Sequence, residues 1–296
     1  MTIDLGLLGA HLRAHQVTPA AAADVERAGY GTLWLDASPP ADLTLAEELL
    51  DATTGLAVGT SVVNVWTADP DAVAASYRRI EARHPGRFLL GVGIGHREVH
   101  REYASPYDTL ASYVDRLAAK GVPADRTVVA ALGPRMLRLA RDRTAGAVPC
   151  MVTQEHTRRA RSVLGAGKLL LPGHFALPQP DAERARAIAR SAPPGTALGV
   201  ANYANNLRRL GFTDDDLADA GSDRLIDGLV AHGDPAAVAR GLLAHRDAGA
   251  DHVGVYPLGG DPIATLLAVA QAVHGVGDQT RRGPRPVTGR GPRAWS

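Results

Sequence analysis

The sequence predicts an α/β fold in which parallel strands and helices alternate to form a closed eight-stranded barrel. Between Gly55 and His96, an apolar run, a helical pattern and a second apolar run follow one another, which is the order of a parallel crossover unit. Similar apolar runs recur along the chain, and eight of them meet the requirement of a (β/α)8 barrel. In such folds the chemistry lies in the loops that follow the strands.

The expected elements alternate regularly over the first 170 residues. The strands are expected at residues 3–8, 32–36, 56–65, 88–92, 127–132, 145–150, 168–171 and 252–256. The helices are expected at residues 19–28, 43–52, 72–82, 107–119, 135–141 and 155–164. The segment 181–248 is long and helical by pattern, so we expect a helical insertion before the last strand that covers one side of the barrel mouth.

The domain organisation follows from a change of composition near the end of the chain. Residues 1–275 are expected to form one barrel domain, whereas residues 276–296 contain five arginines among Gly, Pro and Thr. A segment with so few apolar side chains buries too little surface to offset its ordering entropy. The sequence therefore predicts a disordered basic tail.

The overall composition excludes several classes of protein. Thirty-two basic and 31 acidic residues give a net charge of +1, so no global field favours nucleic acid. The single cysteine, Cys150, excludes an intrachain disulfide and a cysteine-based zinc site, and no metal is expected. No apolar run approaches the ~20 residues that a membrane span needs. These features favour a cytoplasmic enzyme without a membrane partner.

Two segments resemble a known family. Gly59-Thr60-Ser61-Val62 and the run from Pro85 to Gly93 closely resemble the bacterial luciferase-like monooxygenase superfamily, and within it the branch that uses the deazaflavin coenzyme F420. Further matches lie at residues 29–35, 131–137 and 202–212. The resemblance implies an oxidoreductase that moves a hydride between the deazaflavin and a small organic substrate, by reduction of a C=C, C=O or C=N bond. It also implies a homodimer and a separate enzyme that supplies reduced coenzyme.

The resemblance places the coenzyme at the ends of several strands. It implies cofactor-binding roles for ten residues, namely Asp36, Ser61, Val62, Asn64, Gly93, Gly95, Gly133, Pro134, Arg135 and Met136. It also implies that the Ser61–Val62 peptide bond is cis. The glycine-rich run around Gly93 is not a Rossmann fingerprint, because His96 stands where the third glycine is required.

The turn at Gly133-Pro134-Arg135 directly follows an expected strand and begins a helix. Free amides and the positive end of the helix dipole make this junction a suitable anion site, and Arg135 adds a charge-assisted contact. In the family that the chain resembles, the phosphate of the coenzyme lies at this junction. A well-capped barrel helix without a ligand is the other interpretation.

Two histidines, His96 and His11, are the expected catalytic residues. His96 follows a strand and has the side chain that most readily exchanges a proton at neutral pH. His11 and His15 come after the first expected strand, and we expect them to project toward the mouth. A polar cluster between Asn202 and Arg209 has Asn202, Asn205, Asn206 and Arg209 on one helical face. It is expected either to hold an anionic coenzyme tail or to form an exposed helix or a subunit interface.

Two alternatives to this function stay open at the level of sequence. One is a monooxygenase of the same fold that takes reduced FMN from a partner reductase. The other is a non-catalytic relative that binds the coenzyme without turnover. No Gly-x-Ser-x-Gly, Walker or clustered Cys/His pattern favours other chemistry.

Overall fold

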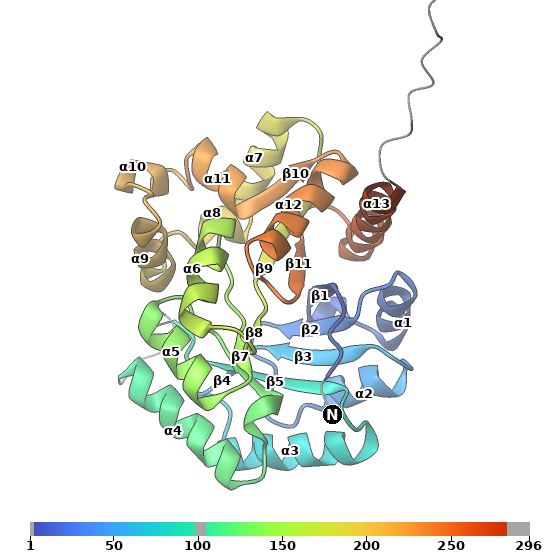
Figure 1. Cartoon of the computed structure of the whole chain (residues 1–296), viewed down its shortest axis with the longest axis vertical. Coiled ribbons are helices and arrows are strands. Elements are labelled where there is room, and N and C mark those ends of the chain that lie inside the picture. The colour runs from blue at the N-terminus through green and yellow to red at the C-terminus, as the bar shows by residue number, and fades with distance from the viewer. Residues whose placement is uncertain (1–2, 97, 99–104, 283–296) are drawn as a thin grey trace, which may run out of the picture.

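The computed structural model describes residues 3–96, 98 and 105–282. The described chain forms a curled parallel sheet that is surrounded by helices (Figure 1). The hydrogen-bonded order of the strands is β10-β9-β11-β1-β2-β3-β5-β6-β7-β8, and β4 pairs with β5.

The strands are short and mostly buried. They are β1 (Leu8–Arg13), β2 (Thr32–Asp36), β3 (Ala57–Ser61), β4 (Val63–Asn64), β5 (Phe88–Gly93), β6 (Thr127–Val129), β7 (Gly146–Ala147), β8 (Leu169–Leu170), β9 (Gly173–Pro178), β10 (Val230–Gly233) and β11 (Val253–Pro257).

The helices lie between the strands in sequence. They are α1 (Pro19–Arg27), α2 (Thr44–Asp51), α3 (Pro70–Arg83), α4 (Pro106–Ala119), α5 (Pro134–Arg143), α6 (Gln154–Leu164), α7 (Ala182–Ser191), α8 (Pro193–Thr196), α9 (Ala201–Arg209), α10 (Asp214–Leu217), α11 (Asp223–Leu229), α12 (Pro235–Asp247) and α13 (Pro262–Arg282). Two 3-10 turns, η1 (Ala14–Gln16) and η2 (Ala124–Arg126), precede α1 and β6.

The sheet closes on itself through β8 and β9, which only Leu171 and Pro172 separate. On one side of this extended segment, Gly173 N donates to Pro149 O, just beyond β7. On its other side, Gly254 N of β11 donates to Pro172 O. The ring of strands therefore runs β11, β1, β2, β3, β5, β6, β7 and β8–β9, which confirms the expected eight-stranded barrel.

The expected first strand is displaced in the structure. β1 begins at Leu8 and ends at Arg13, instead of covering residues 3–8. The cause is a turn at Gly6, which has φ +66° and whose N–H donates to the Asp4 side chain. The apolar run that suggested a strand contributes core side chains, because Ile3 and Leu5 pack inside the barrel.

Two strands were not expected from the sequence. β9 follows β8 after a two-residue break, and β10 adds to the outer edge of β9. The expected helical insertion is therefore partly correct, because α7 to α11 gather on one side of the barrel (Figure 1) but β10 interrupts the helical segment.

The barrel interior differs from one end to the other. At the N-terminal ends of the strands it is apolar, and we call this part the plug: Ile3, Leu5, Trp34, Ala57, Leu89, Val128, Val148 and Leu171. Trp34 is fully buried because two strands carry glycine beside it. A Cβ on Gly9 or Gly59 would lie 2.4 Å from the Trp34 ring system.

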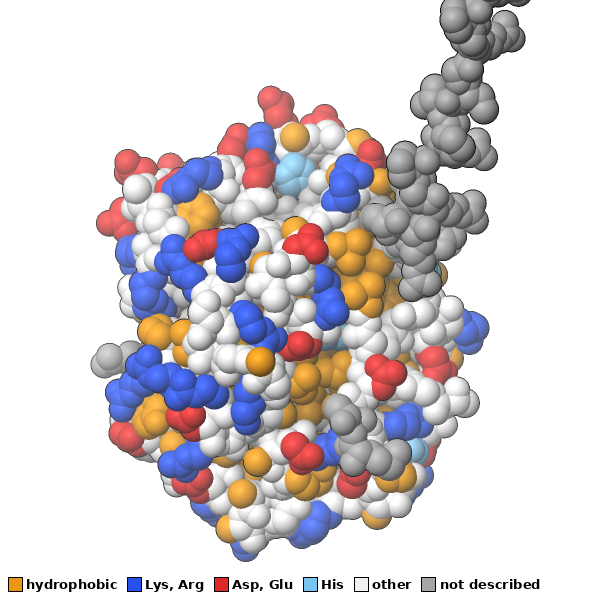
Figure 2. Space-filling view, viewed as in Figure 1, with side chains coloured by type: hydrophobic (Ala, Val, Ile, Leu, Met, Phe, Trp, Pro, Cys, Tyr) orange, Lys and Arg blue, Asp and Glu red, His pale blue; other side chains and the backbone are white. Residues whose placement is uncertain are grey.

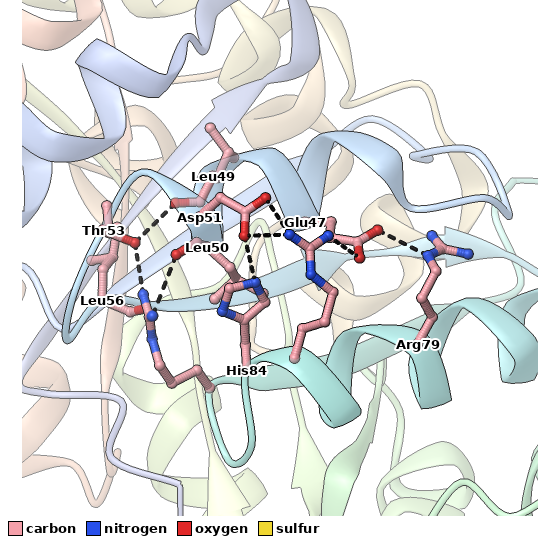
Figure 3. A network of polar contacts seen from close by, with 10 residues as sticks. Glu47, Leu49, Leu50, Asp51, Thr53, Leu56, Arg79 and His84 are labelled. Atoms are coloured by element: carbon pink, nitrogen blue, oxygen red, sulfur yellow. Dashed lines mark hydrogen bonds and ion pairs between the residues drawn. The ribbon is translucent and has the colours of Figure 1, made fainter.

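The helices are fixed to the barrel by polar contacts as well as by apolar packing. Between α2 and α3, the largely buried Glu47 accepts from Arg79 Nε at 2.8 Å and from Arg83 Nη1 at 2.7 Å (Figure 3). Arg83 also pairs with Asp51 at 2.9 Å. This network fixes α3 against α2 along one face of α3.

Three further observations concern the described residues only. None of their helices is long and apolar enough to cross a membrane. No three or more His, Cys, Asp or Glu side chains among them are grouped to hold a metal ion. Helix α13 continues to Arg282, beyond the domain boundary expected at residue 276, and the rest of the predicted tail lies outside the described residues.

Candidate functional site at the barrel mouth

Polar side chains gather at the C-terminal ends of the barrel strands, a region that we call the mouth. Asp36 ends β2 and lies beside Ser61, which ends β3 in the parallel register. Ser61 is a hydrogen-bond partner of Tyr256 on β11. Cys150, which follows β7, contacts the hydroxyl groups of Tyr256 and Tyr203. Five side chains from five segments of the chain therefore meet at one place.

The mouth is electrostatically unusual for a group of ionisable side chains. Burial raises the pKa of Asp36 to about 6, although the Ala37 N–H and the charge of Arg13 oppose the shift. Burial also raises the pKa of Cys150 to about 12, and the Asp36 carboxylate adds to this shift. The pKa values of Tyr203 and Tyr256 are raised in the same direction by burial. The thiol and the two phenols therefore stay neutral and can act as hydrogen-bond donors, whereas the Asp36 carboxyl group titrates close to neutral pH.

The junction of β3 and β4 has the predicted geometry. The Ser61–Val62 peptide bond is cis, as the sequence resemblance implies. A Cβ on Gly93 would lie 2.4 Å from Val62 Cγ2, so Gly93 accommodates the Val62 side chain. Asn64 is buried, and its Oδ1 accepts from Trp66 N at 3.0 Å. Gly95, with φ +64°, begins the loop that carries His96.

His96 lies at the rim of the mouth and contacts α9. Its Nδ1 is 3.0 Å from Asn202 Oδ1, and its ring centroid is 5.0 Å from that of Tyr203. With Nδ1–H donating to the amide oxygen, Nε2 is left as the exchangeable nitrogen. In addition, Ala201 N donates to Glu98 Oε1 at 3.0 Å. The loop after β5 therefore holds the beginning of α9 over the mouth.

The two other histidines lie on β1 and on the 3-10 turn that directly follows it. Because β1 begins five residues later than expected, His11 is inside the barrel and is 2% exposed. Its ring stacks on Tyr256 at 3.9 Å between centroids, and burial lowers its pKa well below the usual value. His15 is exposed on η1. His11 therefore lies deeper in the barrel than expected, against the mouth residue Tyr256, whereas η1 directly follows the C-terminal end of β1.

The N-terminus of α5 differs from those of the other long helices. Among the described helices of eight or more residues, α5 is the one whose first turn has no side-chain acceptor. Gly133 is its N-cap and Pro134 its first residue, so the N–H groups of Arg135 and Met136 remain for a ligand. The predicted junction is therefore an uncapped helix end.

Positive charge lies beside this uncapped end. A Cβ on Gly133 would be 3.5 Å from Arg209 Nη2 of α9. Arg209 also donates to Asn206 Oδ1 at 3.4 Å, and Asn206 is 2% exposed with no described partner for Nδ2. The Arg135 guanidinium lies 4.2 Å from the Tyr107 ring centroid. Neither arginine forms an ion pair with a described carboxylate, and Lys and Arg side chains gather over α5 and α6 in Figure 2.

Besides Val62, Asn64, Gly93 and Gly95 around the β3–β4 junction, the expected cofactor residues fall into two groups. Asp36 and Ser61 lie in the mouth, whereas Gly133, Pro134, Arg135 and the half-buried Met136 form the α5 end. Tyr203 was expected only as part of a polar cluster, and Cys150 and Tyr256 were not expected at all. Both are the last residues of expected strands, a position that could have indicated them.

Comparison with known proteins gives one family match. Residues 10–117 match the model of the luciferase-like monooxygenase family. No curated protein matches the sequence.

Solved structures share the fold over most of the chain. An F420-dependent secondary alcohol dehydrogenase, solved with an F420–acetone adduct, is 15% identical with a TM-score of 0.69, covering 91% of this chain and 99% of that one. The coenzyme F420 dependent tetrahydromethanopterin reductase of Methanopyrus kandleri is 15% identical with a TM-score of 0.71, covering 92% and 99%. The oxygenating constituent of 3,6-diketocamphane monooxygenase from Pseudomonas putida, in complex with FMN, is 14% identical with a TM-score of 0.62, covering 92% and 98%.

These findings confirm the resemblance to luciferase-like monooxygenases, by a family match over residues 10–117 and by the fold of nearly the whole chain. The similar structures include an F420-dependent protein and a protein in complex with FMN.

Proposed function

We propose that this chain is a coenzyme F420-dependent oxidoreductase that transfers a hydride to a small organic substrate with a C=C, C=O or C=N bond. The observation that carries the proposal is the uncapped N-terminus of α5, with Arg209 beside it. Two free amides, a helix dipole and a guanidinium form a site for a phosphate group. When bound, the deazaflavin supplies the hydride chemistry itself.

The arrangement of arginines favours F420 over FMN. Arg135 and Arg138 are both exposed and lie one turn apart on α5, without an ion pair to a described carboxylate. Coenzyme F420 carries an oligoglutamate tail beyond its phosphate, whereas FMN ends at its phosphate. Additional positive charge along α5 fits the longer anion.

The mouth residues have separate roles in this proposal. The neutral hydroxyl groups of Tyr256 and Ser61, together with Asp36, orient the ring by hydrogen bonds. His96 Nε2 holds or delivers the proton that a reduced substrate takes up. Helix α9 excludes water from the mouth, because His96 and Glu98 hold its beginning in place.

The cofactor is tested by fluorescence titration of the purified protein with F420 and with FMN. We expect tighter binding of F420, and Arg209→Gln is expected to weaken it by about 1.5–3 kcal/mol, the range for a hydrogen bond to a charged group. The matched control is Arg141→Gln, since Arg141 lies at the other end of α5 and pairs with Asp142 at 2.7 Å. FMN binding as tight as that of F420 would contradict the proposal.

The role of His96 is tested by turnover. His96→Ala is expected to lower turnover by roughly 10²–10⁴ and to leave F420 affinity nearly unchanged, because a general acid acts on the transition state. Asn202→Ala is the control, since it removes the contact to Nδ1 but keeps the imidazole. A normal turnover of His96→Ala at saturating substrate removes His96 from the mechanism.

A second candidate is the FMN-dependent two-component monooxygenase, which the likeness to an FMN-bound oxygenating subunit supports. It predicts oxygen consumption with externally reduced FMN. A non-catalytic relative would bind the coenzyme tightly, and no acceptor would oxidise the reduced coenzyme in its presence. Under the main proposal, the protein acts as a homodimer and a separate enzyme supplies reduced F420.

A further inference from the structure

A cavity lies at the opposite end of the barrel from the mouth. It has a volume of about 420 Å³, and two segments line it. One is α3, with Tyr77, Arg78, Glu81 and Ala82, and the other is the connection from α4 to β6, with Gly121, Pro123, Asp125 and Arg126. Because α3 ends and η2 ends just before β5 and β6 begin, this cavity belongs to the N-terminal end of the strands.

Two buried polar groups at this cavity have no hydrogen-bond partner. Tyr77 is 2% exposed, and its hydroxyl group has none among the described residues. Glu81 Oε1 accepts from Gly86 N at 2.9 Å, but its Oε2 has no partner either. An unsatisfied buried polar group is costly, and native proteins usually satisfy such groups. These two atoms leave hydrogen-bonding capacity at the cavity that a bound polar molecule would satisfy.

The contrast with the rest of α3 supports this interpretation. On the side that faces α2, Arg79 and Arg83 are paired with Glu47 (Figure 3). Tyr30 and Tyr113, two other buried tyrosines, donate to Leu266 O at 2.8 Å and to Ala68 O at 3.0 Å. The unpartnered groups of α3 are thus confined to its cavity side.

The charges around the cavity define the class of ligand. Glu81 and Asp125 supply carboxylates, whereas Arg78 and the 7% exposed Arg126 supply guanidinium groups. Burial raises the pKa of Tyr77 to about 12, the Glu81 charge adds to this, and the Arg126 charge opposes it. The walls therefore present both signs of charge around one neutral hydroxyl group.

We infer that this cavity binds a small zwitterion, of the class of a free amino acid, with its ammonium group at Glu81 and its carboxylate on the cationic side that Arg78 and Arg126 form. The site is separate from the proposed coenzyme site, and the N-terminal face of such barrels serves stability more often than catalysis. The bound molecule is expected to stabilise the fold without contacting the mouth.

The test is thermal unfolding of the purified full chain with each L-amino acid in turn at millimolar concentration, followed by calorimetric titration of those that raise Tm. At least one is expected to raise Tm saturably, because a ligand of the native state stabilises it by mass action. Its N-acetyl and methyl ester derivatives are expected to bind about tenfold or more weakly, as each removes one charge.

Variants then locate the site. Tyr77→Phe and Glu81→Gln are expected to weaken binding about tenfold, whereas Tyr113→Phe and Glu48→Gln, which lie away from the cavity, leave it unchanged. Tyr77→Phe removes only an unpartnered hydroxyl group, so it is expected to fold normally. The inference is overturned if no amino acid gives a saturable shift, if Tyr77→Phe binds as well as the native chain, or if only uncharged sugars bind.

Discussion

The two ends of the barrel interior contrast most clearly on β2, where Trp34 and Asp36 face the interior two residues apart. Trp34 belongs to the plug, is fully buried, and donates through Nε1 to His252 at 3.0 Å. Asp36 belongs to the mouth and is a half-buried carboxyl group with a raised pKa. Along one strand, the interior changes from a region that stabilises the fold to a region that retains reactive groups at a cost in stability.

The largest expected effect on the free energy of unfolding comes from lowering the pH. Burial lowers the pKa of five histidines, namely His11, His156, His174, His245 and His252. Since an unfolded histidine titrates near pH ~6.5, the unfolded chain binds more protons than the native chain below that pH. The free energy of unfolding is therefore expected to fall with decreasing pH, by up to about 1.4 kcal/mol per pH unit for each histidine.

Asp36 makes the opposite contribution. Its pKa is about 6 in the native chain against the ordinary 3.8, so the native chain binds the extra proton as the pH falls through 6. One carboxyl group cannot offset five histidines. Urea unfolding between pH 7.5 and 5.5 measures the net pH dependence from the five histidines and Asp36. A free energy of unfolding that stays constant or rises as the pH falls would contradict the burial of the neutral histidines.

The next largest expected loss of stability comes from removing a side chain that packs in the plug. Trp34→Ala is expected to lower the free energy of unfolding by about 3–5 kcal/mol, because it leaves a cavity between Gly9 and Gly59. Trp66→Ala is the matched control, since Trp66 is half-buried near the mouth. Chemical denaturation of both variants measures the difference. Equal losses would mean that the two ends do not differ in their contribution to stability.

The smallest expected effect on the free energy of unfolding is a gain in stability, from a substitution in the mouth. Asp36→Asn is expected to raise the free energy of unfolding by about 1–3 kcal/mol at pH 8, because it removes a buried charge. The gain is expected to fall to about half at pH 5 and to disappear only below pH ~4, where the unfolded carboxyl group is protonated as well. The same variant is expected to weaken coenzyme binding or turnover. Denaturation at pH 8 and pH 5, with an activity assay, checks the prediction. A loss of stability at pH 8 would show that the carboxylate is well compensated in the mouth.

The sequence located most strands, but it could not fix every boundary. The range expected for the second strand, residues 32–36, is that of β2, because turn residues border its apolar run on both sides. The first apolar run was misassigned because strand and plug are equally apolar, and only the turn at Gly6 separates them. The position of His11 changed with that boundary, since its direction depends on strand register.

The candidate site was predictable where one segment builds it and not where several do. Gly133, Pro134 and Arg135 are consecutive, so the sequence alone indicated the α5 end as a candidate anion site. The contribution of Arg209 depends on where α9 lies. The contacts of Cys150 with Tyr203 and Tyr256 join residues more than fifty positions apart.

The sequence by itself determined the alternation of strands and helices and the resemblance to luciferase-like proteins, because short contiguous segments carry both. The cis peptide at Ser61–Val62 was implied by that resemblance. Only the tertiary structure decided which polar groups meet at the mouth, which helix end stays uncapped and which buried histidines are neutral. Those properties depend on burial and on contacts between distant segments, and closing the barrel creates both.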